Sequence, residues 1–293
     1  MGRVIAIANQ KGGVGKTTTA VNLAAALAVA EKKVLLVDID PQGNATSATG
    51  ISTSEIANHQ IYQVLLGELS IESCIHPTEL ERLFLLPASG DLIGFEIEAI
   101  ELPEREFCLK KALASVRDQY DFILIDCPPS LGLVTVNALT AADGVLVPLQ
   151  CEYFALEGLG RLLGTLDRIR RSLNRTLLLE GIVLTMFDRR NNLAHQVAKE
   201  VEEHCAAQLW KTQIPRNVRL SEAPSFGKPI FLYDIRSPGA QAYLALASEF
   251  MERIGKGAET TPNVVPKGVA NDGTESVGPG TLVPHTESTP DGR

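Results

Sequence analysis

The sequence lacks paired cysteines and long apolar runs, and each absence excludes a class of protein. Its five cysteines stand apart without a C-x-x-C pair, which argues against a zinc site or a disulfide framework. No apolar run is long enough to span a bilayer, and the N-terminus has no signal-peptide pattern. We therefore expect a cytoplasmic protein that is not embedded in a membrane.

An excess of positive charge is also lacking, because the 293 residues carry a formal net charge of −8. Such a chain is a poor indiscriminate binder of nucleic acid. The charge is uneven, since residues 161–236 hold 13 Lys and Arg against 8 Asp and Glu. Nine of those basic residues are arginines between Arg161 and Arg219. Charge alone favours solvated helix faces here over a binding surface.

Short apolar runs alternate with longer helical patterns along the chain. We expect strands at 3–9, 33–38, 82–87, 121–126, 144–149 and 178–185. We expect helices at 17–31, 104–119, 133–142, 155–173, 191–208 and 237–254. Apolar strands separated by helices predict an α/β fold, a mostly parallel twisted sheet flanked by helices on both faces. Right-handed crossovers then place ligand-binding loops along one edge of that sheet.

The composition changes near residue 255 and divides the chain into two parts. Residues 1–254 contain every expected strand and helix, so we expect them to form one domain. Residues 255–293 are rich in Pro, Gly, Thr and Ser and contain no aromatic residue. Such a segment buries too little apolar surface to offset its ordering entropy, so we expect this tail to be disordered.

The stretch KGGVGKTT, residues 11–18, joins an expected strand to an expected helix. Its glycines let backbone N–H groups curl around an anion, and the helix directs its positive N-terminus at the same anion. Lys16 supplies a charge for terminal phosphates, and the Thr17 hydroxyl is placed to bind Mg²⁺. A phosphate cradle is therefore predicted from Gly12, Gly13, Val14, Gly15, Lys16, Thr17 and Thr18. Gln10 stands where the general motif has glycine.

Carboxylates follow two other expected strands at the same edge of the sheet. Asp126 ends the strand at 121–126, where a second group to hold the magnesium is expected. Asp38 and Asp40 come at and after the end of the strand at 33–38, and Pro41 biases Asp40 towards an extended loop. Asp40 suits the orientation of an attacking water and Asp38 suits the outer shell of the metal. The residues alone leave those two roles open.

Several strings together resemble one family, the ParA/Soj partition ATPases. They are KGGVGKTTTAVNLA, LLVDIDPQGNAT, DFILIDCPPSLGLVTVNAL, CEYFALEGL and IPRNVRLSEAPSFGKPI, and the likeness extends from about residue 3 to 252. The resemblance implies a P-loop ATPase of the deviant Walker A type, with ATP and Mg²⁺ as cofactors and a slow intrinsic rate. It covers residues 1–254 as one ATPase domain and leaves the tail aside.

In this family two subunits sandwich two ATP molecules, and Lys11 matches the signature lysine that reaches the ATP of the partner subunit. Such a cation acts as an arginine finger does, by neutralising charge on the transferring phosphoryl group. The resemblance further implies that Thr17 binds Mg²⁺ directly, that Asp126 acts through a metal-bound water and that Asp40 positions the hydrolytic water. The catalytic set is thus Lys11, Lys16, Asp40 and Asp126.

The resemblance also assigns the last third of the domain. Pro215 and Asn217 match the stretch that holds the adenine. Arg190 and Arg219 match surface arginines that bind double-stranded DNA without sequence preference, and their neighbours Arg189 and Arg216 extend the patch. The implied partners are a second copy of the chain, non-specific DNA and a centromere-binding protein of the ParB type. The implied location is the nucleoid within the cytoplasm.

The main alternative is a MinD-like ATPase that binds membrane at the division site. It needs a basic amphipathic helix near the C-terminus, and the tail shows no such period. An iron–sulfur relative would need converging cysteines, and Cys127 and Cys151 have no supporting partner in the sequence. A P-loop synthetase would need a substrate pocket of which the sequence shows no signature. The partition ATPase is the interpretation that we favour.

Overall fold

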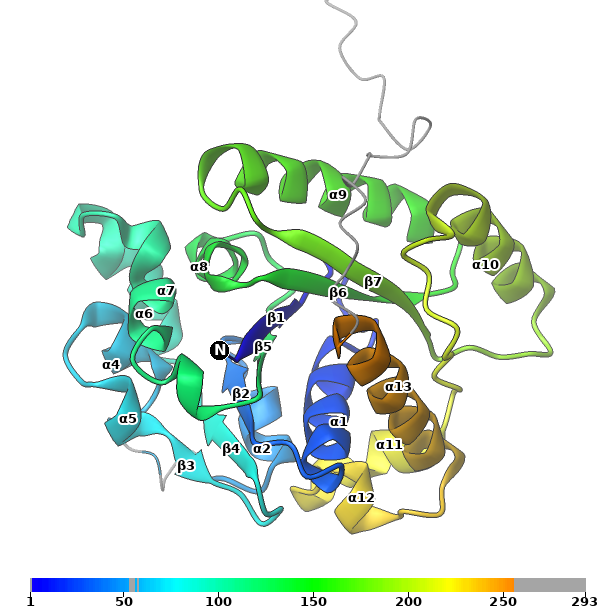
Figure 1. The fold of residues 1–293 in the computed structure, drawn as a ribbon, viewed down its shortest axis with the longest axis horizontal. Helices are drawn as coiled ribbons and strands as arrows, with labels where there is room; N and C mark the ends of the chain where they lie inside the picture. The colour runs from blue at the N-terminus through cyan, green and yellow to red at the C-terminus, as the bar shows by residue number, and fades with distance from the viewer. Residues whose placement is uncertain (1, 53–55, 57, 256–293) are drawn as a thin grey trace, which may run out of the picture.

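The computed structural model describes residues 2–52, 56 and 58–255 (Figure 1). Within these residues one seven-stranded sheet has the order β3-β4-β2-β5-β1-β6-β7. The strands are β1 (Arg3–Ile7), β2 (Val34–Asp38), β3 (His76–Pro77), β4 (Leu83–Leu86), β5 (Phe122–Asp126), β6 (Gly144–Gln150) and β7 (Leu178–Thr185). Neighbouring strands are parallel except at the β3–β4 edge, so the predicted α/β fold is confirmed.

Helices cover both faces of the sheet because successive strand residues point to opposite sides. In β1, Ile5 and Ile7 belong to one hydrophobic cluster, whereas Val4 and Ala6 belong to the other. The first cluster includes α1 (Lys16–Val29), α2 (Asn44–Ala48), α11 (Val218–Glu222), α12 (Ile230–Tyr233) and α13 (Pro238–Gly255). The second includes α4 (Ile61–Leu66), α5 (Ile71–Cys74), α6 (Leu92–Glu98), α7 (Cys108–Leu113), α8 (Leu133–Ala141), α9 (Ala155–Ser172) and α10 (Asn192–Cys205).

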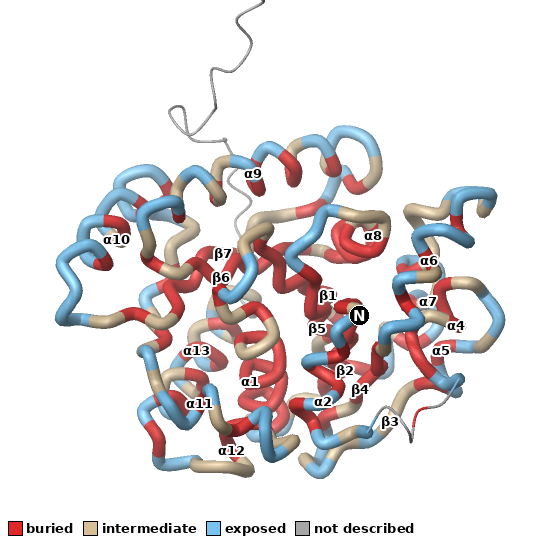
Figure 2. Tube along the Cα trace, turned by 180° about the vertical axis from the view of Figure 1, so that it is seen from behind, coloured by how far each residue is buried: buried red, intermediate tan, exposed pale blue. Residues whose placement is uncertain are grey.

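Burial follows this layering. The central strands and α1 are buried along almost their whole length, whereas α9 and α10 expose their outer faces (Figure 2). The apolar runs that predicted six parallel strands are the ones that lie inside, and their bounds agree to within two residues. The short antiparallel β3 was not predicted, because a two-residue strand leaves no periodic signal.

The prediction of a single helix at 104–119 is wrong. The chain instead forms a 3₁₀ turn (Arg105–Phe107), α7, and a second 3₁₀ turn (Arg117–Gln119). Glu104 adopts a left-handed conformation with φ +53°, which stops a helix from starting there. The Asn137 side chain on α8 then accepts a hydrogen bond from the Leu109 N–H at 3.1 Å and donates one to the Arg105 carbonyl at 2.8 Å. These bonds anchor the turn and the start of α7 to α8.

The last helix, α13, lies beside the first, α1 (Figure 1). The Tyr243 hydroxyl and the Thr19 hydroxyl are 3.2 Å apart, and both side chains are buried. Gly255 is the last residue of α13, so the expected disorder of the tail falls on residues outside those described. No helix in the described ranges has the length and apolar character that crossing a membrane requires.

Candidate functional site

The loop between β1 and α1 is fixed by hydrogen bonds. The Asn9 side chain donates to the Pro148 carbonyl at 2.8 Å and accepts from the Lys11 N–H at 3.0 Å. The Lys16 ammonium donates to the Lys11 carbonyl at 3.0 Å, across the width of the loop. On the far side, the Thr185 hydroxyl at the end of β7 donates to the Val14 carbonyl at 2.8 Å. The loop is therefore held in shape by β6 and β7 as well as by its own residues.

Two glycines give this loop its curvature. Gly13 and Gly15 have φ angles of +73° and +85°, in the left-handed region that favours glycine. Gly15 immediately precedes Lys16, the first residue of α1, so the N-terminus of that helix opens onto the loop. A backbone of this form can present N–H groups to an anion, and the binding of a phosphate here stays a prediction.

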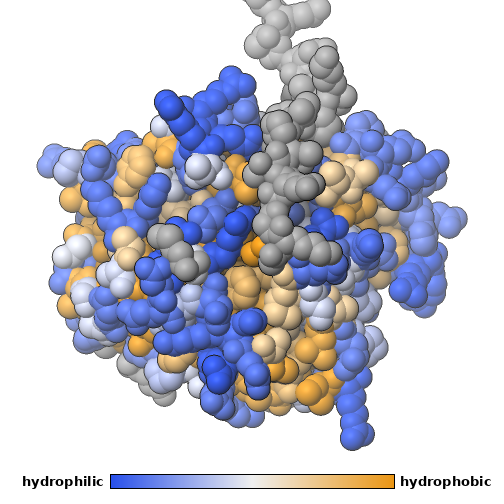
Figure 3. Space-filling model, in the orientation of Figure 1, coloured by the Kyte–Doolittle hydropathy of each residue, from blue (hydrophilic) through white to orange (hydrophobic). Residues whose placement is uncertain are grey.

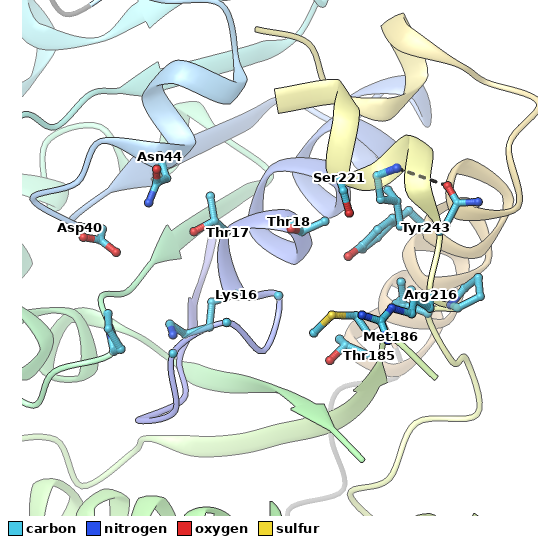
Figure 4. A pocket seen from close by; sticks show the side chains of 18 of the residues that line it. Lys16, Thr17, Thr18, Asp40, Asn44, Thr185, Met186, Arg216, Ser221 and Tyr243 are labelled. Carbon is cyan, nitrogen blue, oxygen red and sulfur yellow. Dashed lines mark hydrogen bonds between the residues drawn. The ribbon is translucent and has the colours of Figure 1, made fainter. Parts of the chain in front are cut away.

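A cavity of about 470 Å³ opens over this loop. Figure 4 shows Lys16, Thr17 and Asp40 toward one end of it and Met186, Arg216 and Tyr243 toward the other. Its walls come from the phosphate loop, the loop after β2, the end of β7, the segment before α11, and α13. Parts of the chain that are more than 200 residues apart thus meet around one space.

Lys16 is buried, with 7% of its surface exposed. Burial lowers the pKa of its ammonium, and the nearby carboxylate of Asp126 acts in the opposite direction. A buried ammonium that touches a cavity needs negative charge to compensate it. The phosphates of a nucleotide would supply that charge.

Asp126 is the residue at this site that tests whether a magnesium ion fits. It is fully buried at the end of β5, and neither carboxylate oxygen has a hydrogen-bond partner within the described protein. Burial raises the pKa of Asp126 well above its usual value, as does the charge of Asp38, whereas the nearby Thr17 hydroxyl, which does not meet hydrogen-bond geometry, and the Lys16 charge favour the charged form. Two unpaired buried oxygens beside a threonine hydroxyl suit a hydrated divalent cation, which would stabilise the charged carboxylate.

Asp38 and Asp40 differ in what their oxygens already do. Asp38 is buried, accepts bonds from the Thr46 N–H and hydroxyl, both at 2.8 Å, and accepts from the Asp40 N–H at 3.0 Å. Burial raises the pKa of Asp38 to about 6, although these hydrogen bonds act to lower it. Asp40 lines the cavity and accepts only from the Gln42 N–H at 3.0 Å among the residues described. Asp40 is therefore better placed than Asp38 to bind a water, and the outer-shell role of Asp38 stays a prediction.

The opposite end of the cavity contains both residues expected at the adenine. Pro215 and Asn217 line it, and the Asn217 oxygen accepts from the Leu220 N–H at 3.3 Å to cap α11. That cap explains why an asparagine stands there. The lining residues that sequence reasoning missed include Asn44, Thr185, Met186, Ser221 and Tyr243. Asn44 could have been found from its place after the second strand, whereas the rest give no local signal.

Lys11 does not line this cavity. Its ammonium forms an ion pair with Glu152 in the loop after β6, and a little over a third of the lysine side chain is exposed. The exposed rings of Tyr153 and Phe154 follow, with their centroids 4.9 Å apart. The neighbouring Gln10 turns away and donates to the Thr165 hydroxyl on α9 at 3.3 Å. The two lysines of the loop thus have different surroundings.

The four arginines expected to bind DNA separate into two groups. Arg189, Arg190 and Arg216 line a second, open groove of about 1040 Å³, next to the nucleotide-sized cavity. Arg219 lies on α11 outside this groove, with Glu222 at 2.9 Å and Asp234 at 3.6 Å. Hydrophilic residues gather over the neighbouring α10 (Figure 3, right). Their role in binding DNA stays a prediction.

Comparison with known proteins is consistent with this site. A family model described as an AAA domain matches residues 2–179. The chromosome partitioning protein ParA of Myxococcus xanthus is 57% identical over 253 residues, which are 86% of this chain and 89% of that protein. The sporulation initiation inhibitor protein Soj of Bacillus subtilis is 55% identical over 249 residues, 85% of this chain and 98% of that protein.

A solved structure shows the same architecture with ligands. Cobyrinic acid a,c-diamide synthase from Mycobacterium smegmatis, crystallised with bound ADP and magnesium, is 37% identical and superimposes with a TM-score of 0.77. The match covers 88% of this chain and 97% of that one. The identity to the two partitioning relatives is higher by about 20 percentage points.

Proposed function

Since this chain belongs to the ParA/Soj family of partitioning ATPases, we propose that it forms an ATP-bound sandwich dimer which binds DNA non-specifically and releases it upon hydrolysis. ATP and Mg²⁺ are its cofactors. Repeated binding and release on the nucleoid would move a chromosome or plasmid that carries a ParB-type protein. Contact with that partner would trigger hydrolysis, which is otherwise slow.

The observation that carries this proposal is the separation of the two loop lysines. Lys16 lies at the cavity of its own subunit, whereas Lys11 points to Glu152 outside that cavity. A cation that cannot serve its own nucleotide in this conformation is available to a second subunit. Hydrolysis would then require dimerisation, because Lys11 of each subunit would neutralise charge on the phosphates of the other.

The residues around the phosphates have separable tasks in this proposal. Lys16 and the N-terminus of α1 bind the phosphates, and Thr17 with the unpaired carboxylate of Asp126 would hold the magnesium and its water. Asp40 would orient the attacking water, because its carboxylate reaches the cavity. Magnesium, when bound, neutralises the phosphate charge that develops during transfer.

DNA binding is the part of the proposal that rests on charge. Residues 161–236 are basic within an acidic chain, and three of the four candidate arginines line one groove. One subunit offers only a few phosphate contacts, so a dimer that doubles them would bind far more tightly. Dimerisation would in this way let ATP switch DNA binding on.

The test is a mobility shift on non-specific duplex DNA with ADP, ATP and a non-hydrolysable ATP analogue, each with and without a ParB-type protein. Binding is expected with ATP and the analogue only, and the partner should release the ATP complex but not the analogue complex. The same samples should sediment as dimers when they bind. Equal binding with ADP and with the analogue would reject the nucleotide switch.

A further inference from the structure

The cavity that would take the nucleotide and the arginine groove are adjacent spaces with a common wall. Pro215 and Arg216 line both of them, and in Figure 4 Arg216 lies beside Met186 at the end away from Asp40. Residues far from the phosphate loop therefore contact both spaces within one subunit. A ligand on one side of this wall therefore contacts residues that also form the other side.

A continuous set of bonds connects the phosphate loop with the arginines. The Thr185 hydroxyl donates to the Val14 carbonyl of the phosphate loop at 2.8 Å. Two residues later, the Phe187 N–H donates to the Ile214 carbonyl at 2.9 Å, and the Arg216 N–H approaches the Phe187 carbonyl at 3.4 Å. The common wall is thus paired to the segment that leads directly into Asp188, Arg189 and Arg190.

Met186 stands at the centre of this connection in a conformation that few residues adopt. Its φ angle is +47°, in the left-handed region, and its side chain lines the nucleotide-sized cavity. A non-glycine residue stays in this region only where its surroundings hold it there, and such residues gather at ligand clamps and switches. Here the bonds of Thr185 and Phe187 on either side hold it.

The groove itself is ready for a polyanion. Within the described chain, the side chains of Arg189, Arg216 and Lys211 form no hydrogen bond or ion pair with a carboxylate. Arg190 differs, because Asp188 binds its guanidinium through two contacts of 3.1 Å. The loop that carries Lys211 is held by α13, since the Lys211 N–H and the Thr212 N–H both donate to Glu249 on that helix at 2.9 Å.

We propose that the segment from Thr185 to Arg190 and the wall at Pro215 and Arg216 couple the nucleotide cavity to the arginine groove within a single subunit. Nucleotide in the cavity holds this wall, and the wall holds Arg189, Arg216 and the adjacent Lys211 in register with a DNA phosphate backbone. The coupling rests on the proposed function and adds to it a step that precedes dimerisation. By linkage, DNA in the groove raises nucleotide affinity by the same factor.

The test removes dimerisation and asks whether the coupling survives. Lys11→Ala protein, or wild type diluted until sedimentation shows only monomer, is titrated onto a fluorescent duplex of arbitrary sequence. The titration is done without nucleotide and with a saturating, non-hydrolysable ATP analogue. We expect the analogue to tighten DNA binding by about fivefold in the monomer. Equal affinity in both states would overturn the proposal.

Three variants examine the path. Met186→Gly frees the backbone between Thr185 and Phe187, so the fivefold factor should fall towards one, whereas Met186→Asn keeps a Cβ, tolerates this conformation and should retain the factor. Glu31→Gly is the matched control, because Glu31 has φ +63° in the turn after α1, outside both cavities. Equal loss of coupling in the Met186→Gly and Glu31→Gly proteins would contradict the path.

Lys211 is examined separately. Lys211→Gln should weaken DNA binding about threefold in both nucleotide states, and Lys110→Gln on α7, which lies at the other end of the sheet, should not. An unchanged affinity for Lys211→Gln would remove that lysine from the groove. Wild-type dimers that bind DNA with ATP while monomers show no coupling would overturn this inference alone. Wild type that never binds DNA would reject the proposed function as well.

Discussion

The nucleotide-sized cavity and the arginine groove are neighbours that share a wall, yet they are built in different ways. The phosphate end of the cavity lies at strand ends of one sheet edge, where Lys16, Asp40 and Asp126 are all buried. The arginines and the lysine of the groove are exposed side chains on loops, although α13 supplies part of its lining, and one of these arginines is already paired with a carboxylate. Chemistry that depends on precise geometry uses the rigid edge, whereas recognition of a repeating charge tolerates loops.

The largest effect is expected from a substitution that impairs nucleotide binding in the cavity and leaves the groove intact. Lys16→Ala removes the buried cation, so we expect ATP affinity to fall by about 100-fold or more, as measured by calorimetry. ATP-dependent DNA binding should be lost with it. Lys110→Ala, an exposed lysine on α7, is the control for loss of one charge. A Lys16→Ala protein that still binds DNA only with ATP would contradict the nucleotide switch.

Asp40→Ala separates binding from hydrolysis within the cavity. Without a group to orient the water, the partner-stimulated rate should fall by about 100-fold, while ATP still binds. Dimers should then accumulate on DNA and persist in a pull-down from partner-treated samples. Asp40→Asn keeps an oxygen for the Gln42 N–H and so controls for the loop. Monomeric Asp40→Ala protein in the presence of ATP would count against this role.

The two groups of arginines can be compared directly. Arg189→Gln removes a guanidinium that has no carboxylate partner in the described chain, and Arg219→Gln removes one that already has Glu222 and Asp234. We expect about tenfold weaker DNA binding for Arg189→Gln and a smaller loss for Arg219→Gln, with a lower salt slope in each. A titration by fluorescence anisotropy at several salt concentrations measures both. The reverse order would place the main DNA contact on α11.

The smallest expected effect strengthens binding. Hydrogen bonds from Arg190 lower the pKa of Asp188 to about 2, so its contribution to stability is present above about pH 4 and is lost as the pH falls through about 2. If Arg190 binds DNA as proposed, Asp188 would therefore compete with DNA for it at neutral pH. Asp188→Asn should raise DNA affinity about twofold to threefold. Glu202→Gln on α10, which has no arginine partner among the residues described, should change it less.

The sequence was most informative where local pattern and position coincide. The six parallel strands were predicted because each is a buried apolar run, and the cradle was predicted because its glycines and Lys16 are contiguous. The helix predicted at 104–119 does not form as one element, because the chain turns at Glu104. No local signal in the sequence was strong enough to predict that turn. Its actual form depends on Asn137, a side chain from another helix.

The missed parts of the site have a common physical cause. Tyr243 and Met186 reach the cavity only because β7 pairs with β6 and α13 packs against α1, and no spacing in the sequence encodes those contacts. Asp188 was overlooked for a different reason. A carboxylate beside arginines lowers the net charge, but only in the folded chain does it become clear that Asp188 binds Arg190.

The contact between α1 and α13 has a consequence for synthesis on the ribosome. Tyr243 lines the cavity and meets Thr19, so a nascent chain that has just exposed its phosphate loop has no complete adenine end. More than 200 further residues must emerge before the cavity closes, because the segment at Pro215 and then α13 arrive last. The growing polypeptide would therefore gain full affinity for nucleotide only after α13 has emerged.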